Sequence, residues 1–182
     1  MELRVLSGKA KKVKLKVPRD TRPLSSIAKS SLFSIIQRDL ENTIILDLYA
    51  GSGALGIEAL SRGAIEVDFV EIDKAACNII RENLVRTKFD NYAIVNPIPA
   101  EIFLRYNKNV DLRYDFIFIF QPYDKTNENI ISKSMHLLKE TGMIIFERDS
   151  TRKEKNILGL EIVNIKKYGK TAMTFYKKKL AE

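Results

Sequence analysis

The sequence predicts one α/β domain with a doubly wound, mostly parallel sheet of seven strands that ends in an antiparallel hairpin. Two observations lead to this prediction. From residue 44 onward, short apolar stretches alternate with segments of helical periodicity, which is typical of βαβ units. Residues 160–177 contain two strand-like segments around Tyr168, Gly169 and Lys170, which favours a hairpin. The length of 182 residues suits a single domain with a substantial core.

Residues 1–40 are predicted to form a basic extension that packs on a core domain of residues 41–182. Apolar and basic residues alternate loosely over residues 2–17, so we expect a β-hairpin that turns near Gly8. Ser25 or Ser26 can cap a following helix, because a serine hydroxyl accepts a hydrogen bond from a free backbone N–H group. The apolar stripe of that helix is predicted to consist of Ile27, Leu32, Phe33, Ile35 and Ile36.

The elements of the core follow in regular order along the chain. Parallel strands are predicted at residues 44–46, 65–72, 93–95, 116–120 and 143–146. Helices are predicted at residues 54–61, 73–88, 101–106 and 127–138, with glycine-containing stops after the first and last of them. Residues 116–120 are almost wholly apolar, which predicts a central strand buried on both faces. The closing hairpin is expected to pair residues 160–166 with residues 171–177.

The composition excludes several classes of site. Cys77 is the single cysteine, so neither an internal disulfide nor a zinc site built on cysteines is possible. His136 has no second histidine or cysteine nearby, and we expect no metal site. No apolar run reaches the roughly 18 residues of a membrane span, and the basic N-terminal residues lack the apolar stretch of a signal peptide. We therefore expect a soluble, cytoplasmic monomer.

The net charge of +8 is concentrated at the two ends of the chain. Residues 1–22 carry eight Lys and Arg against two acids, and residues 162–179 carry six Lys and no acid. The middle of the chain, residues 23–161, has a net charge of −3. Confined positive charge fits contact with a nucleic-acid phosphate backbone, although lysine-rich ends can also serve only solubility. Both interpretations remain open on charge alone.

A cofactor motif follows the first predicted strand. Residues 47–56 read Asp-Leu-Tyr-Ala-Gly-Ser-Gly-Ala-Leu-Gly and open a helix. Gly51 and Gly53 permit a tight turn and a close approach of ligand to backbone. Glu71 lies 20 residues after Gly51, where a carboxylate can accept both ribose hydroxyls of a nucleoside. Asp47 can accept the ammonium group of a methionine, so the motif favours S-adenosyl-L-methionine.

Two alternatives compete with this interpretation. The spacing Gly51-x-Gly53-x-x-Gly56 also fits the dinucleotide fingerprint, so a nicotinamide-dependent reductase is a rival function. The acidic Asp47 disfavours that rival, because a carboxylate repels a pyrophosphate. The second alternative is a glycine-rich strand–helix turn without a ligand, which the register of Asp47, the glycines and Glu71 disfavours.

The chain resembles the RsmD family of bacterial 16S rRNA guanine-N2 methyltransferases nearly from end to end. The resemblance is carried by residues 3–9, 14–18 and 21–23, by the cofactor loop and helix at residues 47–64, and by residues 147–150, 168–172 and 175–176. It implies a Rossmann-like S-adenosylmethionine-dependent methyltransferase fold. It also implies that the methyl acceptor is a guanine of 16S rRNA or of the small ribosomal subunit particle.

The departures from the family pattern concern the reaction centre. The family ends its fourth strand with an acidic or amide residue, two prolines and an aromatic residue. Here the same place reads Phe120-Gln121-Pro122-Tyr123, and Phe120 accepts no hydrogen bond. Pro99 and Ala100 stand where an acidic residue often reaches the cofactor adenine. A catalytically weak or inactive homologue that binds cofactor or RNA is therefore an alternative to an active enzyme.

The candidate site residues fall into three groups. The catalytic candidates are Gln121, which has an amide oxygen, Pro122, which can stiffen the loop, and Tyr123, which can stack on the base. The candidates for cofactor binding are Asp47, Tyr49, Ala50, Gly51, Ser52, Gly53, Glu71, Ile72 and Ala100. The candidates for RNA binding, by phosphate contact, are Lys9, Lys11, Lys12, Lys14 and Arg22.

Overall fold

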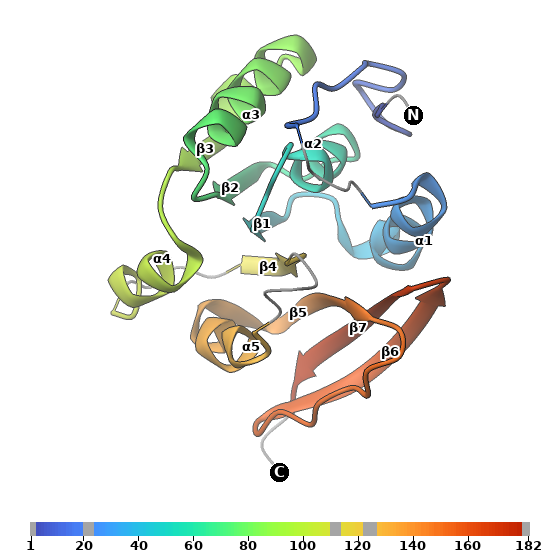
Figure 1. The fold of residues 1–182 in the computed structure, drawn as a ribbon, viewed down its shortest axis with the longest axis vertical. Helices are drawn as coiled ribbons and strands as arrows, with labels where there is room; N and C mark the ends of the chain where they lie inside the picture. The colour runs from blue at the N-terminus through green and yellow to red at the C-terminus, as the bar shows by residue number, and fades with distance from the viewer. Residues whose placement is uncertain (1–2, 20–23, 110–113, 122–126, 180–182) are drawn as a thin grey trace.

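The computed structural model describes residues 3–19, 24–109, 114–121 and 127–179. Within these residues, one seven-stranded sheet has the order β3-β2-β1-β4-β5-β7-β6 (Figure 1). The strands are β1 (Ile44–Leu48), β2 (Glu66–Val70), β3 (Ala93–Asn96), β4 (Tyr114–Ile119), β5 (Leu138–Asp149), β6 (Leu160–Tyr168) and β7 (Thr171–Lys178). Strands β1 to β5 are parallel to their neighbours, and β7 is antiparallel to both β5 and β6. This arrangement confirms the predicted fold class.

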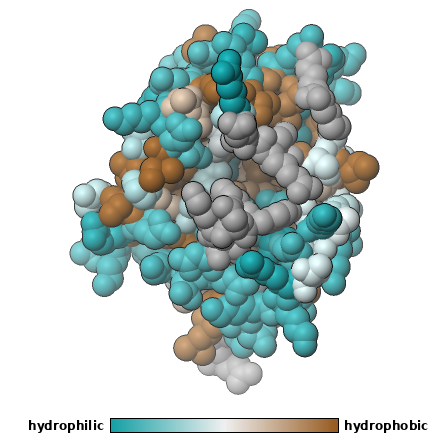
Figure 2. All heavy atoms as spheres, viewed as in Figure 1, coloured by the Kyte–Doolittle hydropathy of each residue, from teal (hydrophilic) through white to brown (hydrophobic). Residues whose placement is uncertain are grey.

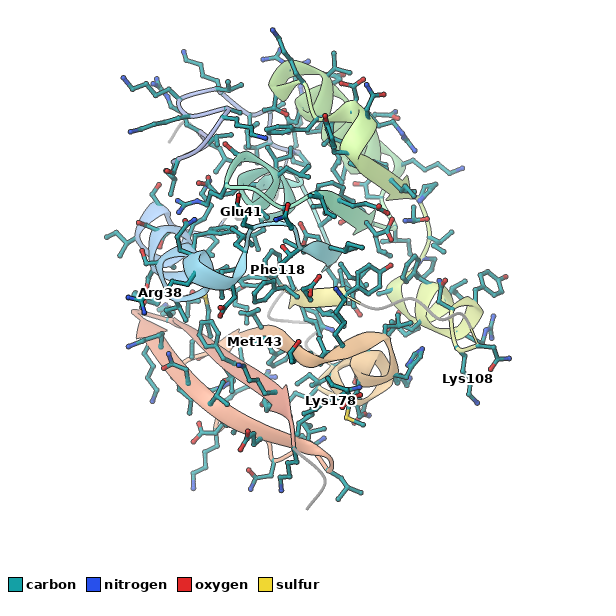
Figure 3. The ribbon with its side chains drawn as sticks, turned by 180° about the vertical axis from the view of Figure 1, so that it is seen from behind. Arg38, Glu41, Lys108, Phe118, Met143 and Lys178 are labelled. Atoms are coloured by element: carbon teal, nitrogen blue, oxygen red, sulfur yellow. The ribbon has the colours of Figure 1, made fainter. Side chains whose placement is uncertain are left out.

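Helices cover both faces of the sheet. On one face lie α1 (Ser26–Ile36), α2 (Ala54–Ser61) and α3 (Lys74–Thr87), and on the other lie α4 (Ala100–Tyr106) and α5 (Asn129–Ser134). Arg38, just after α1, and Lys108, just after α4, accordingly lie on opposite sides of the molecule (Figure 3). Strand β4 is central because its side chains alternate between two apolar layers: Phe116 and Phe118 face α1 to α3, and Ile117 and Ile119 face α4 and α5.

The parallel strands place their carboxyl ends at one edge of the sheet. Leu48 of β1 pairs with Val70 of β2 and with Ile119 of β4, and Ile119 pairs with Phe146 of β5. In doubly wound folds ligands bind at this edge, where the strand order reverses. The reversal here lies between β1 and β4, so the segments that follow these two strands form the candidate site.

Three details differ from the sequence prediction. The helix expected at residues 127–138 ends at Ser134, continues as a 3₁₀ turn (Met135–Leu137) and gives way to β5, which starts at Leu138. The long β5 includes a register shift opposite Tyr114 and Phe116, so Thr141 and Gly142, the predicted helix stop, lie inside the strand. Ile27, predicted in the buried stripe of α1, is 74% exposed because it faces solvent in the first helical turn.

The predicted N-terminal hairpin forms as an irregular pairing of residues 3–5 with residues 12–15, with one bridge between Arg4 and Lys14. Antiparallel backbone hydrogen bonds join Val5 N to Val13 O at 3.0 Å, Lys12 N to Val5 O at 2.9 Å and Leu15 N to Leu3 O at 2.9 Å, and helix α2 holds the segment as well. The backbone N–H groups of Leu6 and Ser7 donate to the buried Glu58 carboxylate at 2.7 and 3.0 Å. Glu58 is also paired with Lys29 and Arg62. The segment therefore docks on a buried cluster of charges, which hydrophobic alternation could not predict.

Among the described residues, no helix is long and apolar enough to cross a bilayer.

Candidate cofactor and reaction site

The loop between β1 and α2 has an unusual backbone. Tyr49, Gly51 and Gly53 have φ angles of +61°, +56° and +73°, in the left-handed region. Glycine adopts this region freely, whereas Tyr49 does so at a cost of about 1 kcal/mol or more. Ala50 anchors the loop, since its N–H donates to Val70 O at 3.1 Å and its carbonyl accepts from Gly53 N at 2.8 Å. The predicted tight turn is confirmed.

The loop leaves space where a ligand needs it. A Cβ atom added at Gly51 would meet no other atom within 4 Å, so the backbone faces open space there. A Cβ atom at Gly56, in contrast, would lie 2.4 Å from the Phe69 ring, so this glycine serves the close packing of α2 on β2. The glycines of the motif therefore divide between ligand approach and helix–sheet packing.

Asp47 lies beneath the loop and is 1% exposed. Its Oδ2 accepts the Gly56 N–H at 3.0 Å, which holds the first turn of α2 against the end of β1. Burial raises the pKa of Asp47 to about 8, and the nearby Glu71 contributes to the rise, whereas the Gly56 hydrogen bond opposes it. A cation placed here would stabilise the ionised carboxylate, so Asp47 fits an ammonium group.

Glu71 lies across the loop from Asp47, just after β2. Its carboxylate accepts the Gly51 N–H at 2.8 Å and the Asp73 N–H at 3.0 Å. Each carboxylate oxygen can accept further hydrogen bonds, which suits a ribose. The next residue, Ile72, is 65% exposed and offers an apolar surface at the same edge. Asp73 itself caps α3 by accepting from Ala75 N.

The remaining predicted cofactor residues have mixed surroundings. Ser52 is buried, and its carbonyl accepts from Asn83 Nδ2 at 3.0 Å. Ala100 is 4% exposed at the start of α4, after Pro99. Glu71 N donates to Asn96 O at 3.2 Å, so the segment that leads from β3 to α4 runs beside the end of β2 at the carboxyl edge.

Sequence reasoning missed Asn83, which is fully buried in α3. Its Oδ1 accepts the Lys16 N–H at 2.8 Å, and its Nδ2 donates to the carbonyls of Lys16 at 2.9 Å and Ser52 at 3.0 Å. The side chain therefore joins the N-terminal segment to the cofactor loop. An asparagine in an amphipathic helix gives no sequence signal for such a role.

The segment after β4 carries the predicted reaction centre. Phe120 continues the strand alternation, packs against the core beneath α1 to α3 and meets the Phe118 ring edge to face at 6.5 Å. Gln121 is 3% exposed, its Oε1 accepts the Asn127 N–H at 2.5 Å and its Nε2 donates to Asn127 O at 3.4 Å. Its amide oxygen is thus already engaged. Pro122 and Tyr123 lie outside the described residues.

Tyr49 connects the cofactor loop to this segment. Its hydroxyl donates to Glu101 Oε1 at 3.2 Å and also contacts Gln121. Burial and the neighbouring Glu101 carboxylate raise the pKa of Tyr49, so the phenol stays protonated and remains a donor. The ends of β1 and β4 and the first turn of α4 are therefore linked by side chains at one place.

The predicted RNA-binding lysines lie further away. Lys9, Lys11 and Lys12 belong to a turn held by the last residue of α2, since Lys9 N donates to Ser61 O at 2.8 Å. Helix α2 starts at the cofactor loop, so eight residues at 1.5 Å each put this turn about 12 Å from the loop along the helix axis. Lys14 follows the turn and Arg22 lies outside the described residues.

Two further features do not coincide with this site. A hollow of about 670 Å³ lies at the opposite, amino edge of the sheet, bordered by Gly63, Ile65, Lys88 and Tyr92. Across the residues that the structure describes, no group of three or more His, Cys, Asp or Glu side chains is placed to hold a metal ion.

The chain is similar to known methyltransferases over most of its length. The model of a family described as conserved hypothetical protein 95 matches residues 3–177. The Bacillus subtilis protein named "Putative rRNA methyltransferase YlbH" is 32% identical over 97% of this chain and 100% of its own length. The Escherichia coli protein named "Ribosomal RNA small subunit methyltransferase D" is 29% identical over 80% of this chain and 71% of its own length.

A solved structure extends the similarity to three dimensions. The Thermus thermophilus protein TTHA0928, described as hypothetical, superimposes with a TM-score of 0.84 and 29% identity over 96% of this chain and 98% of that one.

Proposed function

Because the chain belongs to the conserved hypothetical protein 95 family, that of the RsmD-type ribosomal RNA methyltransferases, we propose that it methylates the N2 amine of a guanine in 16S rRNA. Membership supports an RNA methyltransferase, and the choice of guanine N2 and of 16S rRNA, free or in the small-subunit particle, is the finer part of the proposal. We place the reaction in the cytoplasm, with the protein acting as a monomer.

The observation that carries the proposal is the pair of carboxylates on either side of a glycine loop with open space above it. Asp47 is a buried acid with no ion pair to a cation among the described residues, and Glu71 offers acceptors at the end of β2. S-adenosyl-L-methionine has a cationic ammonium group that suits Asp47 and a ribose that suits Glu71. It also supplies a methyl group on a positively charged sulfur. The open space at Gly51 and the exposed Ile72 support the fit of its nucleoside.

The same features argue against a nicotinamide-dependent reductase. The buried acid at Asp47 matches a cationic group, whereas the pyrophosphate of a dinucleotide would bring only negative charge to the loop. The sheet also ends β5-β7-β6 with β7 antiparallel, whereas the common dinucleotide-binding sheet continues β4-β5-β6 in parallel. Tight binding of NADH without measurable binding of S-adenosylhomocysteine in calorimetry would reverse this choice.

We infer that the reaction centre lies at the end of β4, with Gln121 as a positioning residue. The amide of Gln121 bonds to the backbone N–H and carbonyl of Asn127 and so joins the described residues on either side of residues 122–126. An exocyclic guanine amine has a delocalised lone pair, and an oxygen that accepts its N–H bonds aligns that pair with the methyl group. Backbone carbonyls around Pro122 are our candidates for this acceptor, with Tyr123 stacking on the base.

The surroundings of β4 also favour a second candidate function, a cofactor- and RNA-binding homologue that methylates slowly. Phe120 offers no acceptor and packs into the core, and the Gln121 oxygen is already bonded. Loss of one hydrogen-bonding group at a reaction centre costs on the order of 10²–10³ in rate. The two candidates share cofactor and RNA binding and differ only in turnover.

Transfer of a tritiated methyl group to undermethylated small ribosomal subunits distinguishes the candidates. The proposed enzyme incorporates label into the N2 position of a 16S guanine, as identified by nuclease digestion and chromatography. Binding of S-adenosylhomocysteine without incorporation into RNA would replace it with the second candidate. Label in ribosomal protein instead of RNA would show that the proposed acceptor is wrong.

A Phe120→Asn variant sharpens the comparison, because it restores an acceptor at the end of β4. We expect methyl transfer to rise by about 10²–10³-fold if the chain lacks that group. A Phe118→Leu variant, altered two residues earlier in the same apolar layer, is the control for repacking and should show no such rise.

A further inference from the structure

We propose that a basic surface formed by residues 150–156 and 166–170 binds the RNA phosphates next to the target nucleotide. The inference rests on the proposed function and goes beyond it by assigning the phosphate contacts nearest to the reaction centre. We call this the carboxyl-edge basic surface. Its cations are Arg152, Lys153, Lys155, Lys166, Lys167 and Lys170, and all of them are exposed.

Strand register places this surface level with the end of β4. Ile119 pairs with Phe146, so Gln121 lies level with Arg148. Asp149, the last residue of β5, pairs with Thr171, the first residue of β7, so the turn between β6 and β7 lies at the carboxyl edge. Lys167 pairs with Ala172, which itself pairs with Arg148. With strands about 4.8 Å apart, β7 and β6 lie about 10 and 14 Å from β4.

The two parts of the surface are joined to each other. Ser150 N donates to Lys170 O at 2.9 Å, and Ser150 Oγ donates to Gly169 O at 2.8 Å. Hydrogen bonds from the backbone and side chain of Thr151 hold Asp149 in this loop and lower its pKa, and the charges of Arg152 and Lys170 add to that effect. The loop after β5 and the hairpin turn therefore act as one surface.

A buried arginine holds this surface in place. Arg148 is 1% exposed, and its guanidinium donates to Thr174 Oγ1 at 3.2 Å, to the backbone carbonyls of Asp149 and Arg152, and to Glu154 Oε2 at 2.8 Å. Arg148 thereby compensates the charge of Glu154, so Glu154 does not offset the positive charge of the surrounding lysines. A guanidinium with this many fixed partners orients the loop before any ligand arrives.

The charge and polarity fit an RNA backbone. Residues 150–170 contain six Lys and Arg against Glu154 and Glu161, a net charge of +4. Side chains over the β6–β7 hairpin are mostly hydrophilic (Figure 2). Lysines spread along a strand edge contact phosphates without reading bases, so this surface holds the RNA and leaves selection of the nucleotide to the β4 segment. The N-terminal lysine turn lies at the far end of α2, so it serves a more distant stretch of RNA.

The test compares Lys170→Gln with Lys179→Gln in otherwise intact protein. Both lysines are exposed, but Lys179 follows the far end of β7, about 26 Å from Thr171 at 3.3 Å per residue. Binding to undermethylated small subunits is measured across a salt series, alongside kcat and KM for methyl transfer. Each lost phosphate contact should reduce the slope of log affinity against log salt by about 0.7 to 0.9.

We expect Lys170→Gln to reduce the slope by the amount of one phosphate contact and Lys167→Gln/Lys170→Gln by the amount of two contacts. Lys179→Gln should leave the slope unchanged. The KM for RNA should rise with little change in kcat, and melting temperatures should match because the side chains are exposed. Equal slopes for all variants of a wild type that binds and methylates RNA would overturn this inference alone. A wild type that neither binds nor methylates RNA would overturn the proposed function.

Discussion

Replacing Asp47 by Asn should stabilise the cofactor-free protein while weakening cofactor binding. Burial raises the pKa of this carboxyl to about 8. At pH 7 the folded protein keeps the proton and the unfolded chain has released it, because the ordinary pKa of an aspartate is about 3.9. Three pKa units at 1.36 kcal/mol each give a penalty of about 4 kcal/mol at this pH, as an upper value. An asparagine avoids the penalty, and its Oδ1 can still accept the Gly56 N–H.

The sign of the pH dependence follows from the same difference. A raised pKa in the folded state means that the stability contribution is fully present below about pH 4 and is lost as the pH rises toward about 8. The wild type should therefore lose stability relative to Asp47→Asn across this window. At pH 7 the variant should melt roughly 10 °C higher, since 1 kcal/mol shifts the melting temperature of such a chain by about 2–4 °C.

Thermal melting from pH 4 to pH 9, with calorimetry of S-adenosylhomocysteine at pH 7, tests both halves of this prediction. Asp68→Asn is the matched control. Asp68 is also buried, accepts the Tyr114 hydroxyl at 2.6 Å and has a pKa raised by burial, but it lies within β2, away from the loop. The control should be stabilised without loss of affinity. An Asp47→Asn variant with the pH profile of the wild type, or with undiminished affinity, would refute the reasoning.

Three other substitutions have expected outcomes. Glu71→Gln should weaken the binding of S-adenosylhomocysteine about 10–100-fold in calorimetry, because it removes a charged acceptor beside Gly51. Unchanged affinity would show that Glu71 does not bind the ribose. Glu58→Gln should cost about 3–5 kcal/mol in urea unfolding, because it leaves the buried Lys29 and the partly buried Arg62 without their counter-charge; a loss below 1 kcal/mol would contradict this. Gly8→Ala should expose residues 9–16 to proteolysis, because its Cβ would lie 1.7 Å from a carbonyl of α2, whereas Gly169→Ala meets no atom within 4 Å and should not.

The sheet, the loop and the capped helices could be predicted because their signals are local. The alternation of apolar strands with helices, the glycines of residues 47–56 and the Asp73 cap each depend on neighbours within a few residues. The helix expected up to residue 138 failed for the opposite reason. Leu138 pairs with Tyr114 of β4, and from Met143 onward β5 pairs with both β4 and β7, so tertiary pairing outweighs the local helical preference at the end of this segment.

The candidate site was only partly predictable, because side-chain partners come from distant parts of the chain. The sequence motif identifies the residues of the loop. It does not show that the Gln121 amide oxygen accepts the Asn127 N–H, or that the Tyr49 hydroxyl donates to Glu101. The sequence predicts RNA contact for the lysines of the N-terminal turn but not their position, which follows from docking on α2. The net charge of a sequence predicts how much positive charge the surface carries, but the fold determines where that charge lies.

The attachment of the N-terminal segment has a consequence for the order of events during synthesis. Leu6 bonds to a residue 52 positions further along, and Lys16 bonds to Asn83, 67 positions further along. The N-terminal segment emerges from the ribosome first, but its bond to Asn83 can form only after most of α3 has been synthesised. Slow closure of such long-range contacts makes this segment a late step in folding. A ribosome stalled before residue 83 would carry a nascent chain whose basic arm is still undocked.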